Sequence, residues 1–185
     1  MQSAIIEKIR DILKTKDRAI IAIDGKCASG KTTLSEKLEK ELHCSVIHMD
    51  DFFLRPEQRS EDRLNSPGEN VDHERFLLEV LKPLIKGERV FIKPFVCKTQ
   101  TFGKAYELPQ NRITIIEGSY SCHENLRQYY DLHIFCDVDN KTQLERIQKR
   151  NGKEALEIFK TKWIPLEEKY FKAFNIKENS EIVIK

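Results

Sequence analysis

The chain has 185 residues, with 32 Lys and Arg against 30 Asp and Glu and a formal net charge of +2. At roughly 100 to 200 residues per domain, this length predicts one domain, residues 1–185. So small a charge imbalance gives no reason to expect a nucleic acid or a membrane as partner, and 39% hydrophobic residues predict a soluble globule with one core.

The first part of the chain predicts a helix, a strand and a second helix. Apolar residues recur at helical spacing over 3–15. Residues 19–23 are continuously apolar and are closed by Asp24-Gly25, which is typical of a strand buried on both faces of a parallel sheet. Helical spacing returns over 34–42.

The next part predicts a strand, a long loop, a helix and a short strand. The strand covers 44–49 and ends at Asp50, and the polar residues 54–70 form the loop. Apolar residues at helical spacing predict a helix over 76–85, and residues 90–92 predict the short strand.

Three further strands are expected at 113–116, 132–136 and 182–184. Residues 156–174 keep helical spacing, but Pro165 cannot donate a backbone hydrogen bond in mid-helix. Two helices are therefore expected to meet there, with Pro165 in the first turn of the second. Strands alternate with helices along the chain, which predicts an α/β fold with a parallel sheet.

A phosphate-binding motif lies between the first strand and the second helix. Residues 25–32 match GxxxxGK[ST] at every required position. In such a loop the main-chain N–H groups face the phosphates, the lysine (Lys31) reaches the β and γ phosphates, and the threonine (Thr32) binds Mg²⁺. The fold class is therefore predicted as a P-loop NTPase-type parallel β-sheet flanked by helices. The residues expected to hold the nucleotide are Gly25, Lys26, Cys27, Ala28, Ser29, Gly30, Lys31, Thr32 and Thr33.

Carboxylates follow two of the other predicted strands. Asp50 and Asp51 end one strand and Glu117 ends another, which brings them to the carboxyl edge of the sheet, where open α/β folds bind ligands. One of these two aspartates, Asp50 or Asp51, is expected to accept the proton of an acceptor hydroxyl or to help hold Mg²⁺. Glu117 resembles a Walker-B acid that would organise Mg²⁺ together with Thr32.

A phosphate loop by itself is shared by GTPases, ATPases and small-molecule kinases. The chain contains no NKxD tetrapeptide of the kind that binds guanine in GTPases. ATP, with Mg²⁺, is therefore the expected nucleotide.

These motifs, in this order, resemble the uridine kinase and phosphoribulokinase group of P-loop kinases over nearly the whole chain. Residues 25–33 match the family's P-loop with its second threonine, and the DDFF of 50–53 resembles its D-[SD]-F-[YF]. The NVDH of 70–73 resembles its N-F-D-H, and Glu117-Gly118 resembles its E-G.

The resemblance implies roles for single residues. Asp50 would be the general base on a sugar hydroxyl, and Asp72 would hold the ribose hydroxyls. The family closes an arginine-bearing lid over the phosphates. Arg146 and Arg150, four residues apart, would be its arginines here, in a short helical lid at about 146–162.

The chain departs from the family pattern at the nucleobase end. Uridine kinases carry a Tyr-Asp pair after the third strand, where this chain has Phe95-Val96, and the Pro56-Glu57 that follows DDFF also resembles nicotinamide riboside kinases. The remaining candidate substrate contacts are Phe53, His73, Phe95 and Tyr120.

The expected function is therefore an ATP-dependent kinase acting on a hydroxyl of a small molecule, with the 5′-hydroxyl of a nucleoside such as uridine or cytidine preferred. Lys31, Asp50, Arg146 and Arg150 would carry the catalysis. Two alternatives stay open: the same chemistry on nicotinamide riboside or another small alcohol, and a nucleotide-binding regulatory switch without an acceptor. Whether the chain forms a homo-oligomer also stays open.

The five cysteines are odd in number and form no CxxC pair, which favours reduced thiols and a cytoplasmic location. No apolar run approaches the roughly 18 residues of a membrane span. Cys27 lies at a helix N-terminus beside Lys26, where the pKa of a thiol tends to fall. His48, His73 and His123 lack the spacing of a zinc site, so no structural metal is expected.

Overall fold

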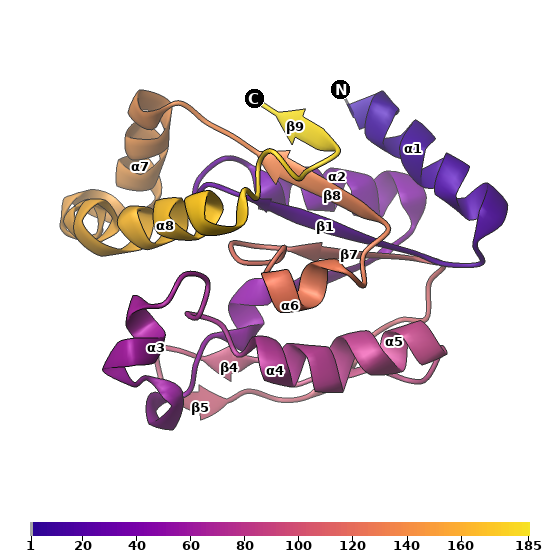
Figure 1. Ribbon diagram of the computed structural model, residues 1–185, viewed down its shortest axis with the longest axis horizontal. Coiled ribbons are helices and arrows are strands. Elements are labelled where there is room, and N and C mark those ends of the chain that lie inside the picture. The colour runs from indigo at the N-terminus through magenta and orange to yellow at the C-terminus, as the bar shows by residue number, and fades with distance from the viewer. Residues whose placement is uncertain (1) are drawn as a thin grey trace.

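A computed structural model describes residues 2–185, and its centre is a five-stranded parallel sheet (Figure 1). The strands lie in the order β2-β7-β1-β8-β9, and every pairing is parallel. The predicted fold class, a P-loop NTPase-type parallel sheet flanked by helices, is confirmed. The strands are β1 (Ala19–Gly25), β2 (Ser45–His48), β7 (Ile113–Glu117), β8 (Leu132–Cys136) and β9 (Ile182–Ile184).

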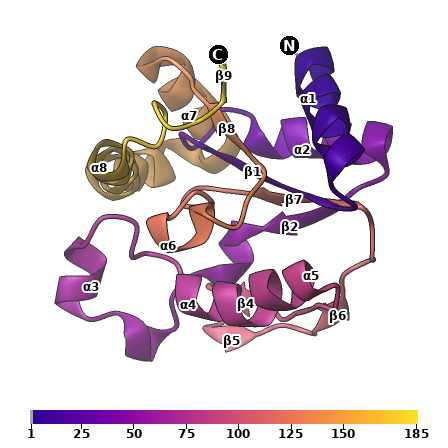
Figure 2. The same cartoon turned by 45° about the vertical axis from the view of Figure 1, so that its right-hand side comes forward.

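Helices cover both faces of the sheet (Figures 1 and 2). Ile21 and Ile23 of β1 join the core beneath α1 (Gln2–Thr15) and α2 (Lys31–Leu42). The alternate residues Ile20 and Ala22 join the core on the opposite face. Because every side chain of β1 is buried, the strand is apolar almost throughout, which is why a continuous apolar run predicted it.

The helix on the opposite face starts earlier than predicted and contains a π-helical turn. It consists of α4 (His73–Phe76), η3 (Leu77–Leu81) and α5 (Lys82–Lys86). It begins at His73 because the Asp72 carboxylate accepts a hydrogen bond from the Arg75 N–H at 3.1 Å and caps the first turn. The Lys82 N–H donates to the Leu77 carbonyl, five residues back, and this wider turn accommodates the following Pro83.

The C-terminal helices join differently from the prediction. The helical stretch consists of α7 (Asn140–Ile158), a π-helical turn η4 (Phe159–Trp163) and α8 (Ile164–Phe174). Pro165 lies in the first turn of α8 as expected, but the backbone keeps helical dihedrals on both sides of η4. The break lies instead at Gly152, with φ 86° and ψ 174°. The extra residue in the π turn accommodates Pro165, so the proline needs no kink there.

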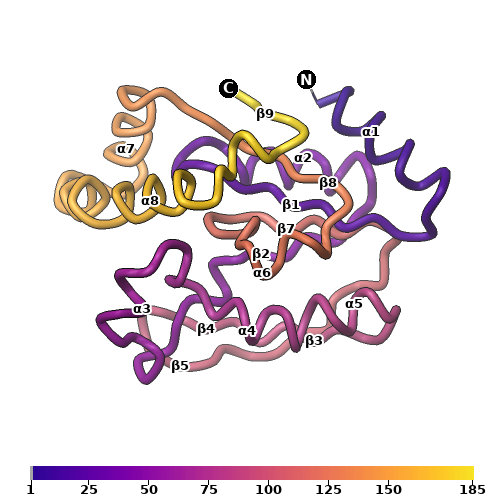
Figure 3. The backbone as a smooth tube through the Cα atoms, in the orientation of Figure 1, coloured from indigo at the N-terminus to yellow at the C-terminus, as the bar shows by residue number. Residues whose placement is uncertain are grey.

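Residues 49–110 leave the sheet after β2 and return at β7, forming the layer of short elements at the bottom of Figure 3. The predicted loop 54–70 is partly helical, and the predicted strand 90–92 pairs in an antiparallel ribbon outside the main sheet. The other two-residue strands of these ribbons were not predicted, because strands so short can form without a periodic sequence pattern. The elements are η1 (Met49–Phe52), η2 (Pro56–Gln58), α3 (Glu61–Asn65), the ribbon of β3 (Phe91–Ile92) with β6 (Tyr106–Glu107) and the ribbon of β4 (Phe95–Val96) with β5 (Thr101–Phe102).

A last short helix, α6 (Glu124–Arg127), follows β7 and packs below the sheet (Figure 1). No helix within residues 2–185 has both the length and the apolar character needed to cross a membrane. All five cysteines are free thiols, and Cys97 is the exposed one.

Candidate functional site

The phosphate loop turns between β1 and α2 at a point of very close backbone contact. Gly25 has φ +132°, and a Cβ atom built there would lie 2.1 Å from the Cys136 carbonyl oxygen of β8. Only glycine fits this position. The Lys31 ammonium group donates to the carbonyls of Gly25 at 2.7 Å and Lys26 at 3.0 Å, so it lies within the curve of the loop.

Glu117, at the carboxyl end of β7, faces the start of α2. The Thr32 hydroxyl lies 3.3 and 3.5 Å from its two carboxylate oxygens, and His48 Nδ1 lies 2.5 Å from Oε1. The hydrogen bond to Glu117 raises the pKa of His48. Thr32 and Glu117 together offer the hard oxygen ligands that Mg²⁺ prefers.

Asp50 and Asp51 lie on η1, directly after β2, the neighbour of β7 in the sheet. Asp50 is exposed where it lines the cavity, but the surrounding walls partly desolvate it. This desolvation raises the pKa of Asp50, nearby Glu117 adds to the rise, and Lys31 opposes it. Desolvation also raises the pKa of Asp51. Asp50 lines the cavity and Asp51 does not.

A cavity of about 1080 Å³ joins these groups, between the phosphate loop, the acidic strand ends and α7–α8. A smaller hollow of about 400 Å³ lies at the opposite, amino ends of β1 and β7, and it contains none of the predicted motifs. The predicted site residues that line the larger cavity are Cys27, Ala28, Ser29, Gly30, Lys31, Thr32, Thr33, Asp50, Phe53, Glu117, Tyr120, Arg146 and Arg150.

The two arginines of the expected lid segment come from the exposed face of α7. One N–H of Arg146 donates to the Ala28 carbonyl in the phosphate loop at 3.1 Å, whereas Arg150 bonds its neighbour Asn151. Sequence reasoning missed two aromatic residues of η4, Phe159 and Trp163, which also line the cavity. Helical spacing predicts a helix here but does not show which of its residues line a cavity.

Three predicted substrate contacts do not line the cavity. Asp72 is 2% exposed, and its Oδ2 lies 3.6 Å from Arg55 Nε and 3.7 Å from Arg75 Nε. Phe95 is buried in an edge-to-face contact with a neighbouring phenylalanine. His73 pairs with Glu69 instead.

Asp24, which sequence reasoning did not select, anchors the start of the phosphate loop from beneath. Its buried carboxylate accepts hydrogen bonds from the N–H groups of Gly25 at 2.7 Å and Cys122 at 2.8 Å, and from the Tyr170 hydroxyl at 2.8 Å. Burial raises the pKa of Asp24 to about 6, although these hydrogen bonds oppose the rise. The sequence feature that could have pointed to Asp24 is an acidic residue at the end of an apolar, fully buried strand.

Glu167 of α8, also missed, fixes the loop from the other side. Its carboxylate accepts from the Cys27 N–H at 2.9 Å and from the Ser119 hydroxyl at 2.6 Å. The expectation of a lowered thiol pKa at Cys27 was wrong. Burial and the negative charge of Glu167 raise the pKa of Cys27 to about 12.

Comparison with known proteins identifies the family of this chain. A protein-family model described as "AAA domain" matches residues 21–162. The chain belongs to this family. Uridine-cytidine kinase B of Dictyostelium discoideum is 31% identical to this AAA-domain chain over 142 residues, which are 71% of the chain and 58% of that kinase. The chain therefore spans little more than half of that relative.

Two further relatives cover similar parts of this AAA domain. A uridine kinase of Staphylococcus aureus (strain JH9) is 27% identical over 150 residues, covering 75% of the chain and 71% of that kinase. The tRNA-specific adenosine deaminase subunit tad2 of Schizosaccharomyces pombe is 36% identical over 137 residues, covering 69% of the chain but only 32% of that protein. The resemblance to uridine kinases predicted from the motifs is confirmed.

A solved structure from Bacillus stearothermophilus, described as a possible uridine kinase, has the same fold as this AAA domain. It superposes with a TM-score of 0.70 at 19% identity and covers 98% of this chain and 100% of that one. The two chains therefore share one fold, a parallel sheet flanked by helices.

Proposed function

We propose that the chain is an ATP-dependent kinase that transfers a phosphoryl group to a hydroxyl of a small molecule, the 5′-hydroxyl of a uridine- or cytidine-type nucleoside. The observation that carries this proposal is that Lys31 at the start of α2, Asp50 just after β2 and Glu117 at the end of β7 line one cavity. Relatives named as uridine kinases support the choice of acceptor.

The nucleotide side fits a triphosphate. The tight turn at Gly25 brings main-chain N–H groups and the N-terminus of α2 to one spot, which favours anions. Thr32 and Glu117 would hold Mg²⁺, which in such sites neutralises phosphate charge. Lys31 would exchange its bonds to loop carbonyls for phosphate oxygens, and the arginines of α7 would face the transferring group.

On the acceptor side, Asp50 would take the proton of the attacking hydroxyl. The wall of the cavity raises the pKa of Asp50 above its ordinary value, so its carboxylate is a better base than one in open water. Because the base must be ionised, the transfer rate should rise with pH through this pKa and then level off.

The test is ADP release measured with a panel of nucleosides, nicotinamide riboside and simple alcohols. Asp50→Asn should lower kcat by about 10² to 10⁴, while ATP affinity changes far less, since Asp50 interacts with Lys31 of the loop through charge and not through a hydrogen bond. Asp51→Asn is the matched control and should lose far less. Normal turnover in Asp50→Asn would remove Asp50 from the mechanism, and ADP release that ignores every acceptor would favour the regulatory switch.

For Asp72 to hold ribose hydroxyls, Arg55 must move aside, because the two residues are paired in this structure. If a diol takes the place of Arg55, Asp72→Asn should raise the KM for a ribonucleoside more than for its 2′,3′-dideoxy analogue. We also propose a cytoplasmic location, which the five free thiols support.

A further inference from the structure

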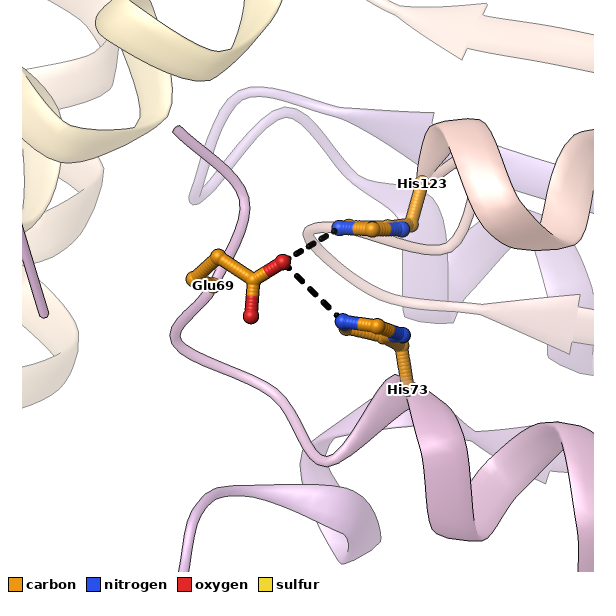
Figure 4. Close-up of side chains that lie close together, drawn as sticks. All are labelled: Glu69, His73 and His123. Atoms are coloured by element: carbon orange, nitrogen blue, oxygen red, sulfur yellow. Dashed lines mark hydrogen bonds and ion pairs between the residues drawn. The ribbon is translucent and has the colours of Figure 1, made fainter. Parts of the chain in front are cut away.

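We propose that Glu69, His73 and His123 form a binding site for a zinc ion, outside the nucleotide cavity. Their ligand atoms all lie within 4.8 Å of one another. Glu69 belongs to the turn before α4, His73 begins α4, and His123 precedes α6 (Figure 4). None of the three lines the cavity. Sequence spacing gave no zinc motif because the fold brings these residues together from separate segments.

The two imidazoles present the same nitrogen to one carboxylate oxygen. His73 Nε2 lies 3.0 Å and His123 Nε2 3.5 Å from Glu69 Oε1, and the rings are stacked with centroids 4.0 Å apart (Figure 4). Two imidazole nitrogens and one carboxylate oxygen are a ligand set that zinc accepts. Mg²⁺ and Ca²⁺ prefer oxygen ligands alone, so this site differs in chemistry from the one at Thr32 and Glu117.

His123 is the member that most needs a partner. Its side chain is 1% exposed, and Nε2 has no hydrogen bond. A neutral imidazole nitrogen with no hydrogen-bond partner is a suitable ligand for a metal ion. Binding through Nε2 places the ring proton on Nδ1, which ends the long 3.3 Å contact from the Asn125 N–H. A metal bond would then satisfy a buried nitrogen that now lacks a partner.

The charges around the cluster favour a cation. Glu69 Oε2 lies 3.2 Å from Arg63 Nε, and Arg63 also bonds Glu74, whose carboxylate is 3.7 Å from His73 Nε2. Two carboxylates thus face one guanidinium, which leaves a net negative charge when the imidazoles are neutral. Arg63 also orients the Glu69 carboxylate, as outer-shell partners do for metal ligands.

Glycine leaves space at the edge of the site. Gly68 has φ +80°, and a Cβ there would lie 2.9 Å from His123 Cδ2 and 3.3 Å from Nε2.

Zinc at about 2.0–2.1 Å from both nitrogens requires the stacked rings to tilt until their lone pairs converge. A bound ion would tie the turn before α4 to α6. Asn70 and Tyr120, close to the ligands in sequence, line the cavity, so the ion would brace that wall.

The test uses the full chain, stripped of metal with a chelator and then titrated with Zn²⁺ and with Co²⁺. We expect one equivalent of Zn²⁺ and a higher Tm. The Co²⁺ complex should show visible d–d absorption without a thiolate charge-transfer band, which separates this site from the five free cysteines. Absence of a stoichiometric equivalent, or a thiolate band, would overturn the proposal.

Variants locate the site. Glu69→Gln keeps the size of the side chain and should weaken Zn²⁺ binding by at least about tenfold, and His73→Asn should do the same. The matched control is His133→Asn, since His133 also lies beside a carboxylate, Glu181 at 3.2 Å, but forms no three-residue cluster. Unchanged affinity in Glu69→Gln would reject the site. If His73→Asn does not fold, Glu69→Gln decides, because Glu69 is only half-buried.

Discussion

On the proposed nucleotide side of the cavity, main-chain atoms of the phosphate loop pack directly against the sheet. On the proposed acceptor side, the side chains of Arg63 and Arg75 help to join short elements. Gly25 leaves no space before β8. Arg75 donates to the carbonyls of Asp51 and Lys93 and lies over the rings of Phe52 and Phe102. Tight backbone packing tolerates almost no substitution, whereas contacts made by side chains tolerate more. The amino-acid sequence on the acceptor side can therefore vary more than the sequence on the nucleotide side.

The largest expected difference comes from adding one methyl group on each side. Gly25→Ala would place a Cβ 2.1 Å from a backbone oxygen, so it should lower the free energy of unfolding by more than about 4 kcal/mol or prevent folding. Gly103→Ala, beside the β4–β5 ribbon, meets only ordinary contacts from 3.5 Å outward and should cost less than about 1 kcal/mol. Urea unfolding measures both, and equal losses would contradict the comparison.

Asp24 should give the nucleotide side a distinct pH dependence. Its pKa is about 6 in the folded chain against 3.8 in the unfolded one, so the folded state holds the proton more tightly. The free energy of unfolding should therefore fall by about 3 kcal/mol as pH rises from about 4 to 6, and then level off.

Asp24→Asn should remove that fall, measured as the difference between variant and wild type in urea unfolding at each pH. Asp51→Asn is the acceptor-side control, and its effect should be smaller because Asp51 is only half-buried. If the wild type and Asp24→Asn lose stability in parallel between pH 4 and 6, Asp24 does not ionise in that range.

Removing one hydrogen-bonding side chain from each side should raise the KM of a different substrate in each variant. Glu167→Ala leaves the Cys27 N–H and the Ser119 hydroxyl unpaired, at a cost of about 1–3 kcal/mol, and should raise the KM for ATP. Arg75→Ala should cost a similar amount but raise the KM for the acceptor. Steady-state kinetics with both substrates varied would expose a shared effect, which would mean that the two sides are not independent.

The smallest effect is a difference in thiol reactivity. Cys97 is exposed at the acceptor side, whereas Cys27 is buried in the phosphate loop with a pKa of about 12. Iodoacetamide should label Cys97 first, and a bound acceptor should slow that labelling more than nucleotide alone. Mass spectrometry of the labelled peptides gives both rates, and faster labelling of Cys27 would show that the loop opens in solution.

Local patterns predicted the parts of the site that lie within one element or at its end. The apolar run of β1 and the motif at 25–32 required no knowledge of distant residues, and Glu117 followed from its place at a strand end. The same local logic placed Pro165 in the first turn of a helix, but it did not predict the π-helical turn that precedes this helix. It failed at Cys27, because Glu167 is 140 positions away in the sequence.

The sequence by itself determined the parallel sheet, the phosphate loop and the acids at the strand ends, because backbone periodicity and a contiguous motif encode them. Only the tertiary structure decided that Asp24 and Glu167 anchor that loop, that Asp72 faces arginines, and that two histidines meet at Glu69. Burial, charge pairing and ligand geometry depend on which segments pack together, and spacing along the chain does not specify that.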